Sequence, residues 1–239
     1  MKITLIHGQN HLGSSCHIGR ILAEKLSAPE ERTEFFLPRD LNHFCCGCCR
    51  CIDQEEACPF YENKRVILDA MEAADLLIFT TPTYCMHASA PMKSFLDLTF
   101  TSWMVHRPRK AMFSKKAIVI STAAGCGTQS AIKDIKTALT YWGIPEIYSL
   151  GFSVQAMGWD QVAESKKAEI KKKIQKLTSR LSANGRPAVP FKTKFLFEIM
   201  RKMQISGMGS SPAEKQYWYE MGWLGRSRPW KNAQQETRP

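Results

Sequence analysis

The chain has 239 residues, 44% hydrophobic and 23% charged, a composition that excludes disordered and fibrous proteins and is typical of an ordinary globular chain. Its formal net charge of +11 would suit a nucleic-acid-binding protein, but residues 1–163 carry 16 basic and 16 acidic side chains, whereas residues 164–239 carry 17 and 6. The excess charge belongs to the C-terminal part alone, and we expect no nucleic-acid partner.

The first residues, MKITLIHG, form a short apolar run without a small-residue cleavage site, so we do not expect a signal peptide. Nor does any stretch approach the roughly 18 apolar residues of a membrane span. These features predict a cytoplasmic protein, in whose reducing environment structural disulfides are rare.

Five short apolar runs predict buried β-strands. In chain order they cover residues 2–8, 33–38, 75–82, 115–122 and 146–153. The runs are continuous rather than alternating, which is typical of parallel strands covered on both faces. Because helical patterns such as 14–26 and 128–143 separate them, the sequence predicts an α/β fold with a doubly wound five-stranded parallel sheet. A ligand crevice is expected at the carboxyl ends of its strands.

The loops after the first, third and fourth strands would form that crevice. In the first loop, Gly8 and Gly13 are spaced like the glycines of a nucleotide P-loop, but Ser14 stands where an NTPase needs lysine. Hydroxyls and the helix N-terminus could still hold one terminal phosphate, although an N-cap role for Ser14 or Ser15 explains the pattern equally well. The other two loops, 81–99 and 121–127, expose small residues against which a flat ligand could lie.

Together these loops resemble the flavin-binding loops of the flavodoxin-like superfamily, specifically its NADPH-dependent FMN reductase branch. The resemblance rests on GQNHLGSS (8–15), PTYCMHASAPMKSFLD (82–97) and TAAGCG (122–127), and covers about two thirds of the chain. It implies a flavodoxin-like fold, a noncovalent FMN and NAD(P)H as the electron donor. Because a bound flavin carries out the electron transfer itself, no catalytic side chain is expected.

The resemblance also implies which residues bind FMN. Those expected at the phosphate are Gln9, His11, Ser14, Ser15 and the backbone of Cys16. Those expected at the ring are Pro82, Thr83, Tyr84, Cys85, Met86, Thr122, Ala123, Ala124, Gly125 and Gly127. The family usually has a proline and a basic residue where this chain has Asn10 and His11, so the role of His11 stays open. Cys85 and Cys126, within these loops, are expected to be buried structural cysteines.

Six of the nine cysteines lie in FCCGCCRCIDQEEACPF (44–60). Cys45, Cys48, Cys51 and Cys58 have the spacing C-x2-C-x2-C-x6-C, which resembles that of iron–sulfur flavoproteins and suits a [4Fe–4S] cluster. Two other interpretations stay open. The cysteines could be plain thiols or a redox pair without metal, or they could bind zinc, although zinc usually takes two separated C-x2-C pairs.

The lysine-rich helical pattern at 159–181 predicts the last helix covering the sheet, and ANGRPAVP (183–190) indicates a linker. We therefore divide the chain into a flavodoxin-like FMN-binding domain, residues 1–183, and a helical C-terminal extension, residues 184–239. Helices are expected in the extension over 191–205 and 211–223, the second opening with a capping box of Ser211 and Glu214.

Aromatic residues of the extension present too much apolar surface to leave exposed. They are Phe195, Phe197, Trp218, Tyr219 and Trp223. The preferred explanation is that the extension packs on the body or across a homo-oligomer, a dimer or tetramer. An anionic membrane surface, which basic amphipathic helices can bind, is the second and less favoured explanation. Nucleic acid is the third, because the aromatic residues follow helical spacing rather than forming a platform for single strands.

These features predict an FMN-dependent NAD(P)H oxidoreductase that passes electrons to a second, small-molecule acceptor. His106 and Arg107 are expected in a solvated loop, with the 2′-phosphate of NADPH as an alternative partner. The alternative functions are an iron–sulfur flavoprotein that carries electrons between protein partners, and a flavodoxin-fold binding module without catalysis.

Overall fold

A parallel β-sheet forms the centre of the computed structural model, which describes residues 1–183, 185 and 187–231. Its strands are β1 (Ile3–His7), β2 (Arg32–Phe36), β3 (Leu76–Tyr84), β5 (Lys116–Ala123) and β6 (Glu146–Ser153). They lie in the order β2-β1-β3-β5-β6 and every neighbouring pair is parallel. A two-residue strand, β4 (His87–Ala88), pairs antiparallel with the end of β3. The strand order confirms the predicted doubly wound sheet and places its switch point between β1 and β3, where such sheets bind ligands.

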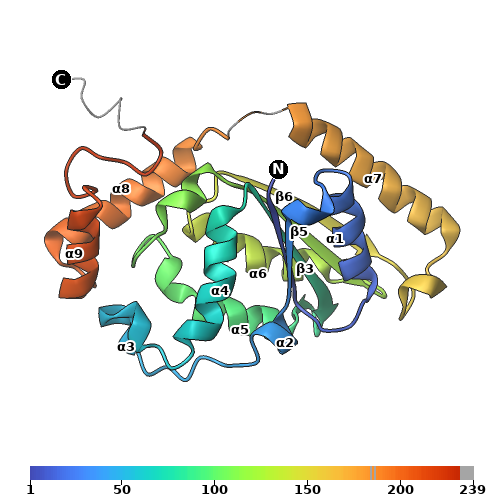
Figure 1. The fold of residues 1–239 in the computed structure, drawn as a ribbon, viewed down its shortest axis with the longest axis horizontal. Coiled ribbons are helices and arrows are strands. Elements are labelled where there is room, and N and C mark those ends of the chain that lie inside the picture. Colours follow the sequence, from blue (N-terminus) through green and yellow to red (C-terminus); the bar gives the residue numbers. More distant parts are fainter. Residues whose placement is uncertain (184, 186, 232–239) are drawn as a thin grey trace.

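Helices cover both faces of this sheet (Figure 1). One face packs against α1 (Ser14–Glu24) and α7 (Glu164–Ala183). The other face packs against α4 (Tyr61–Ala73), α5 (Ala90–Leu98) and α6 (Thr128–Tyr141). Two short helices, α2 (Leu37–Asp40) and α3 (Arg50–Asp53), lie between β2 and α4 along the chain. The two-sided cover explains why the strands are apolar along their whole length.

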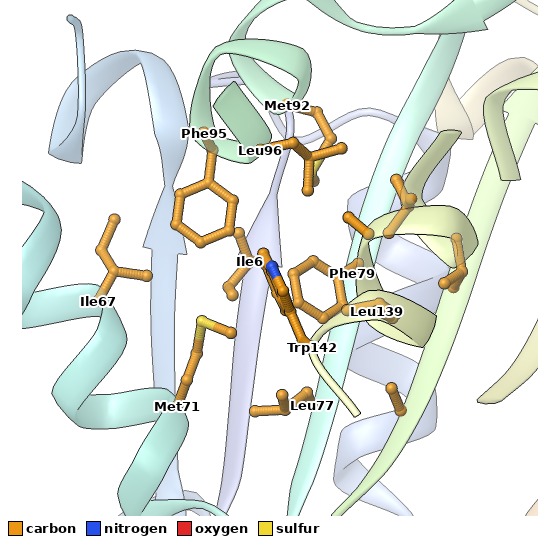
Figure 2. Packing of buried hydrophobic residues seen from close by; sticks show 14 of the residues in the cluster. Ile6, Ile67, Met71, Leu77, Phe79, Met92, Phe95, Leu96, Leu139 and Trp142 are labelled. Carbon is orange, nitrogen blue, oxygen red and sulfur yellow. The ribbon is translucent and has the colours of Figure 1, made fainter. Parts of the chain in front are cut away.

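Trp142 forms the centre of the core on the α4–α6 face (Figure 2). Its ring centroid lies 6.3 Å from that of Phe79 on β3 and 6.2 Å from that of Phe95 on α5, the latter edge to face. Aromatic pairs at these distances add packing energy beyond the area they bury. Trp142, at the C-terminal end of α6, thereby links the sheet to α5 and α6.

The C-terminal extension packs on the side of the body next to α3 and α4 (Figure 1). It consists of α8 (Phe191–Ser206) and α9 (Pro212–Glu220), and α9 begins with the predicted capping box. Phe197, Trp218 and Trp223 are fully buried together with Met104 and Phe113 of the body. No described helix has both the length and the apolarity needed to cross a membrane.

Residues 104–109 hold both the extension and the cysteine segment. The Val105 carbonyl accepts from Gln204 Nε2 at 2.8 Å, and the His106 carbonyl accepts from Trp218 Nε1 at 2.6 Å. Arg107 donates to the carbonyls of Cys51 and Asp53. The expectation of a solvated loop at His106 and Arg107 is therefore wrong, because long-range partners on two different segments use their polar groups.

Candidate functional site

A cleft of about 270 Å³ opens where β1, β3, β5 and β6 end. Most of the residues predicted to bind FMN line it. They are His11, Ser14, Ser15, Pro82, Thr83, Tyr84, Thr122, Ala123 and Ala124. The structure therefore brings the three predicted loops to one place, because parallel strands end at the same edge of a sheet.

The first loop forms one end of the cleft. Gly13 has an extended backbone at the N-cap of α1, and no side chain caps the helix, which has no acidic residue in its first turn. Ser14 and Ser15 are buried there, and within the described part of the chain neither hydroxyl has a hydrogen-bond partner. Free hydroxyls beside uncapped helical N–H groups fit a phosphate, so these residues suit the terminal group of FMN.

The second and third loops contact each other beside the cleft. Thr83 Oγ1 lies 2.9 Å from Ser121 Oγ. A Cβ atom added at Gly127, where φ is +94°, would lie 2.8 Å from Met86 Sδ. Only glycine fits this position without strain, because the backbone is left-handed and Met86 fills the space above it. These contacts hold the two loops against each other next to the cleft.

A fourth loop, after β6, completes the cleft and was not predicted from the sequence. It contributes Val154, Ala156 and Met157. The Val154 N–H donates to the Ala123 carbonyl at 2.9 Å, which holds this loop against the one after β5. The available signal was its position after the fifth strand, since every loop at that edge is a candidate.

Six predicted residues do not line the cleft: Gln9, Cys16, Cys85, Met86, Gly125 and Gly127. Cys16 lies in the first turn of α1 with its side chain buried, which agrees with a backbone role only.

Cys85 and Cys126 are exposed, so the expectation that they are buried structural cysteines is wrong. At Cys85 the cause is the tight β3–β4 turn, in which Cys85 and Met86 have φ of +47° and +68°.

A buried polar network joins β1, β2, β3 and α1 next to the first loop. His7 Nδ1 lies 2.7 Å from Thr80 Oγ1, and His7 Nε2 lies 2.7 Å from Glu34 Oε1. Arg20 donates two hydrogen bonds of 2.7 Å to the Glu34 carboxylate. Burial alone would raise the pKa of Glu34, but the bonds from Arg20 and His7 outweigh it and lower the pKa to about 2.

Cys16 borders this network, with Sγ 4.0 Å from His7 Nε2. Burial raises the pKa of its thiol to about 11. The possible ligand atoms of His7, Cys16 and Glu34 all lie within 4.8 Å of one another. Hydrogen bonds already satisfy both nitrogens of His7 and both oxygens of Glu34, so the group supports the loop without needing a metal ion.

The cysteine segment combines buried and exposed side chains. Cys51 is buried, Cys58 is half-buried, and Cys45 and Cys48 are exposed. Burial raises the pKa of Cys51, whereas a hydrogen bond with the Arg50 backbone lowers that of Cys48. Across residues 1–183, 185 and 187–231, no three sulfur atoms of this segment lie close enough together to bind one metal ion such as zinc. This argues against a single-ion site and not against a [4Fe–4S] cluster, whose larger core holds its ligand sulfur atoms further apart.

A larger hollow of about 640 Å³ lies at the opposite edge of the sheet, where the strands begin. Lys115 is buried in its wall, and burial lowers the pKa of this side chain. Its Nζ donates to the carbonyl oxygens of Glu72 at 2.8 Å and Ala74 at 2.5 Å. Lys115 therefore caps the end of α4, and we do not assign this hollow to the cofactor.

Comparison with known proteins agrees with the cleft at the carboxyl ends. The family model for NADPH-dependent FMN reductase matches residues 1–157, which include all four loops. A curated relative, an iron–sulfur flavoprotein of Archaeoglobus fulgidus, is 29% identical over 115 residues, 47% of this chain and 50% of that protein. The match thus spans about half the length of the relative.

Solved structures share the fold. An NAD(P)H:quinone oxidoreductase from Methanothermobacter marburgensis has a TM-score of 0.58 at 16% identity, covering 77% of this chain and 98% of its own. An FMN-dependent NADH-azoreductase from Bacillus anthracis, in complex with FMN, has a TM-score of 0.54 at 13% identity, covering 74% of this chain and 100% of its own. At such low identity these likenesses establish the fold alone, and they confirm that it is flavodoxin-like.

Proposed function

This chain belongs to the NADPH-dependent FMN reductase family of FMN-dependent NAD(P)H oxidoreductases, and from that premise we propose that it oxidises NAD(P)H through FMN bound in the cleft and passes the electrons to a second, small-molecule acceptor. The observation that carries the proposal is the cleft itself. It joins two serines at the start of α1, whose hydroxyls have no hydrogen-bond partner among the described residues, to two walls formed by the loops after β3 and β5.

The proposed role of the protein is to bind and orient. Ser14 and Ser15 would hold the phosphate with the N–H groups of the first turn of α1, while Pro82–Tyr84 and Thr122–Ala124 would flank the ring. FMN, when bound, supplies the hydride and electron chemistry. The remaining predicted residues, including Gln9, His11 and Gly127, would act by shaping these loops.

We propose a planar, mainly apolar acceptor such as a quinone. Tyr84 and Met157 line the cleft and are both exposed, so the mouth offers apolar surface to a second flat molecule. Assembly as a homo-oligomer and a cytoplasmic location remain parts of the same proposal.

A second candidate is an iron–sulfur flavoprotein that carries electrons between protein partners. The name of the Archaeoglobus fulgidus relative and the cysteine spacing support it. In this case Cys45, Cys48, Cys51 and Cys58 would be the ligands of the cluster.

One preparation tests these candidates. The protein is purified without oxygen, and its visible spectrum is recorded while FMN, iron and zinc are quantified on the same sample. Flavin bands with fast NADH or NADPH oxidation in the presence of a quinone would support the oxidoreductase. About four irons per chain with no NAD(P)H oxidation would support the carrier. Colourless protein that cannot be reconstituted with FMN would instead indicate a binding module without catalysis.

A further inference from the structure

The outer face of α8 is apolar although it has no partner in the body. Phe191 is 81% exposed and Phe195 is 57% exposed, and their rings stack with centroids 6.1 Å apart. Ile199, one turn further on, is also exposed. The i, i+4, i+8 spacing places the three side chains on one stripe. Thr193 and Phe197, on the other side of the helix, are buried against the body, so the exposure is not a consequence of a detached helix.

Lysines surround this stripe. Lys192, Lys194 and Lys202 are exposed, and within the described part of the chain none of them pairs with a carboxylate. The one acidic residue of α8, Glu198, bonds to Arg228 and lies 3.6 Å from Arg201. We define the outer face of α8 as Phe191, Phe195 and Ile199 together with these three lysines. This face is apolar along its centre, and no carboxylate of the described residues neutralises its lysines.

The charge indicates what covers this face. In a symmetric dimer the same patch would meet itself, so the unpaired lysines of one copy would face those of the other. A partner that is negatively charged at its surface and apolar beneath would pair with the lysines and also bury the three apolar side chains. Anionic phospholipid headgroups over acyl chains have this chemistry, and lysines can reach the headgroups while their stems lie along apolar groups.

We propose that the outer face of α8 docks the protein on an anionic membrane surface. Phe191, Phe195 and Ile199 would enter the boundary between headgroups and acyl chains, and Lys192, Lys194 and Lys202 would contact lipid phosphates. The helix would lie in the plane of the membrane, as interfacial helices do. No residue of α8 lines the candidate cleft, so a docked protein keeps that cleft available. The sequence alone disfavoured a membrane surface because it could not show which aromatic residues the body buries.

The test uses the full chain and vesicles sedimented at low salt. Vesicles of phosphatidylcholine containing about one third phosphatidylserine should bind the protein, vesicles of phosphatidylcholine alone should not, and salt should weaken the binding. The double substitution Phe191→Ser, Phe195→Ser should reduce binding by more than about tenfold. The triple substitution Lys192→Glu, Lys194→Glu, Lys202→Glu should reduce it at least as much, because each lysine near the surface contributes separately.

A matched control changes the same charge elsewhere. This control combines Lys171→Glu, Lys172→Glu and Lys176→Glu, three residues on the exposed face of α7. It should retain most of the binding to anionic vesicles. Fluorescence of the buried Trp218 and Trp223 checks that each variant is folded. Equal loss in the α7 control would overturn the proposal, because it would show binding by bulk charge. So would the absence of binding to anionic vesicles, or a wild-type dimer that the double substitution converts to a monomer.

Discussion

His106 and Glu214 stand 108 residues apart in the sequence, yet His106 Nδ1 lies 2.6 Å from Glu214 Oε1. The same carboxylate accepts from the Ser211 N–H through Oε2 at 3.0 Å, as the return half of the capping box of α9. Glu214 is buried, so one side chain both starts α9 and ties it to the body.

Replacing this carboxylate should weaken the attachment of the whole extension. We expect Glu214→Ala to lower the free energy of unfolding by about 1–3 kcal/mol, because it removes a cap and leaves His106 without its buried partner. Glu220→Ala, at the exposed end of the same helix, is the matched control and should change little. Urea unfolding followed by tryptophan fluorescence measures both, and equal effects would contradict a joining role for Glu214.

The phosphate end of the cleft can be tested by charge. Ser15→Asp would place a carboxylate beside the expected FMN phosphate, and the repulsion should weaken FMN binding by more than about a hundredfold. Flavin fluorescence titration of the apoprotein gives the dissociation constant. Ser165→Asp puts the same change in the first turn of α7, which does not line the cleft, and should leave affinity unchanged. Normal FMN affinity in the Ser15 variant would refute the phosphate site.

Most of the fold was predictable because the strands are buried on both faces. The predicted strand at 146–153 coincides with β6, and the one at 75–82 differs from β3 only at its ends. What local sequence did not predict is β4, since its turn requires left-handed backbone at Cys85 and Met86, which are not turn-forming residue types.

The candidate site was predictable where it depends on loops and not where it depends on distant contacts. Ser14 and Ser15 begin the helix that follows β1 after a six-residue loop, so their place at the crevice follows from the topology. The pairing of His7 with Glu34 depends on the register of β1 against β2, in which His7 aligns with Phe36, two residues beyond Glu34. Contacts of this kind require the fold to be known first.

The network around Glu34 should make stability depend on pH. The pKa of Glu34 is lowered from 4.5 to about 2 in the folded protein, so the unfolded chain takes up a proton at higher pH than the folded one. The stability this provides is full above about pH 4.5 and is lost as the pH falls towards 2. Arg20→Met should therefore destabilise the protein most near neutral pH. The difference in free energy of unfolding between this variant and the wild type should shrink below pH 4.5.

Denaturant unfolding at several pH values measures this difference. Arg39→Met is the control, because Arg39 and Asp40 form a pair on the surface and such pairs contribute little. A difference between Arg20→Met and wild type that stayed constant from pH 7 to about pH 3 would contradict the assignment.

The nine free cysteines should divide into two groups by their rate of alkylation. Cys16 is buried and its pKa is raised to about 11, so at pH 8 it should stay unmodified by iodoacetamide while the exposed Cys46, Cys49, Cys85 and Cys126 react. Mass spectrometry of the digested protein gives the rate at each site, and denatured protein, in which all nine should react, is the control. Adding FMN should slow the alkylation of Cys85 and Cys126, which lie in the loops proposed to flank the ring, and leave that of Cys46 and Cys49 unchanged. If FMN slowed all four equally, the protection would come from a change in the whole protein and the proposed ring site would lose this support.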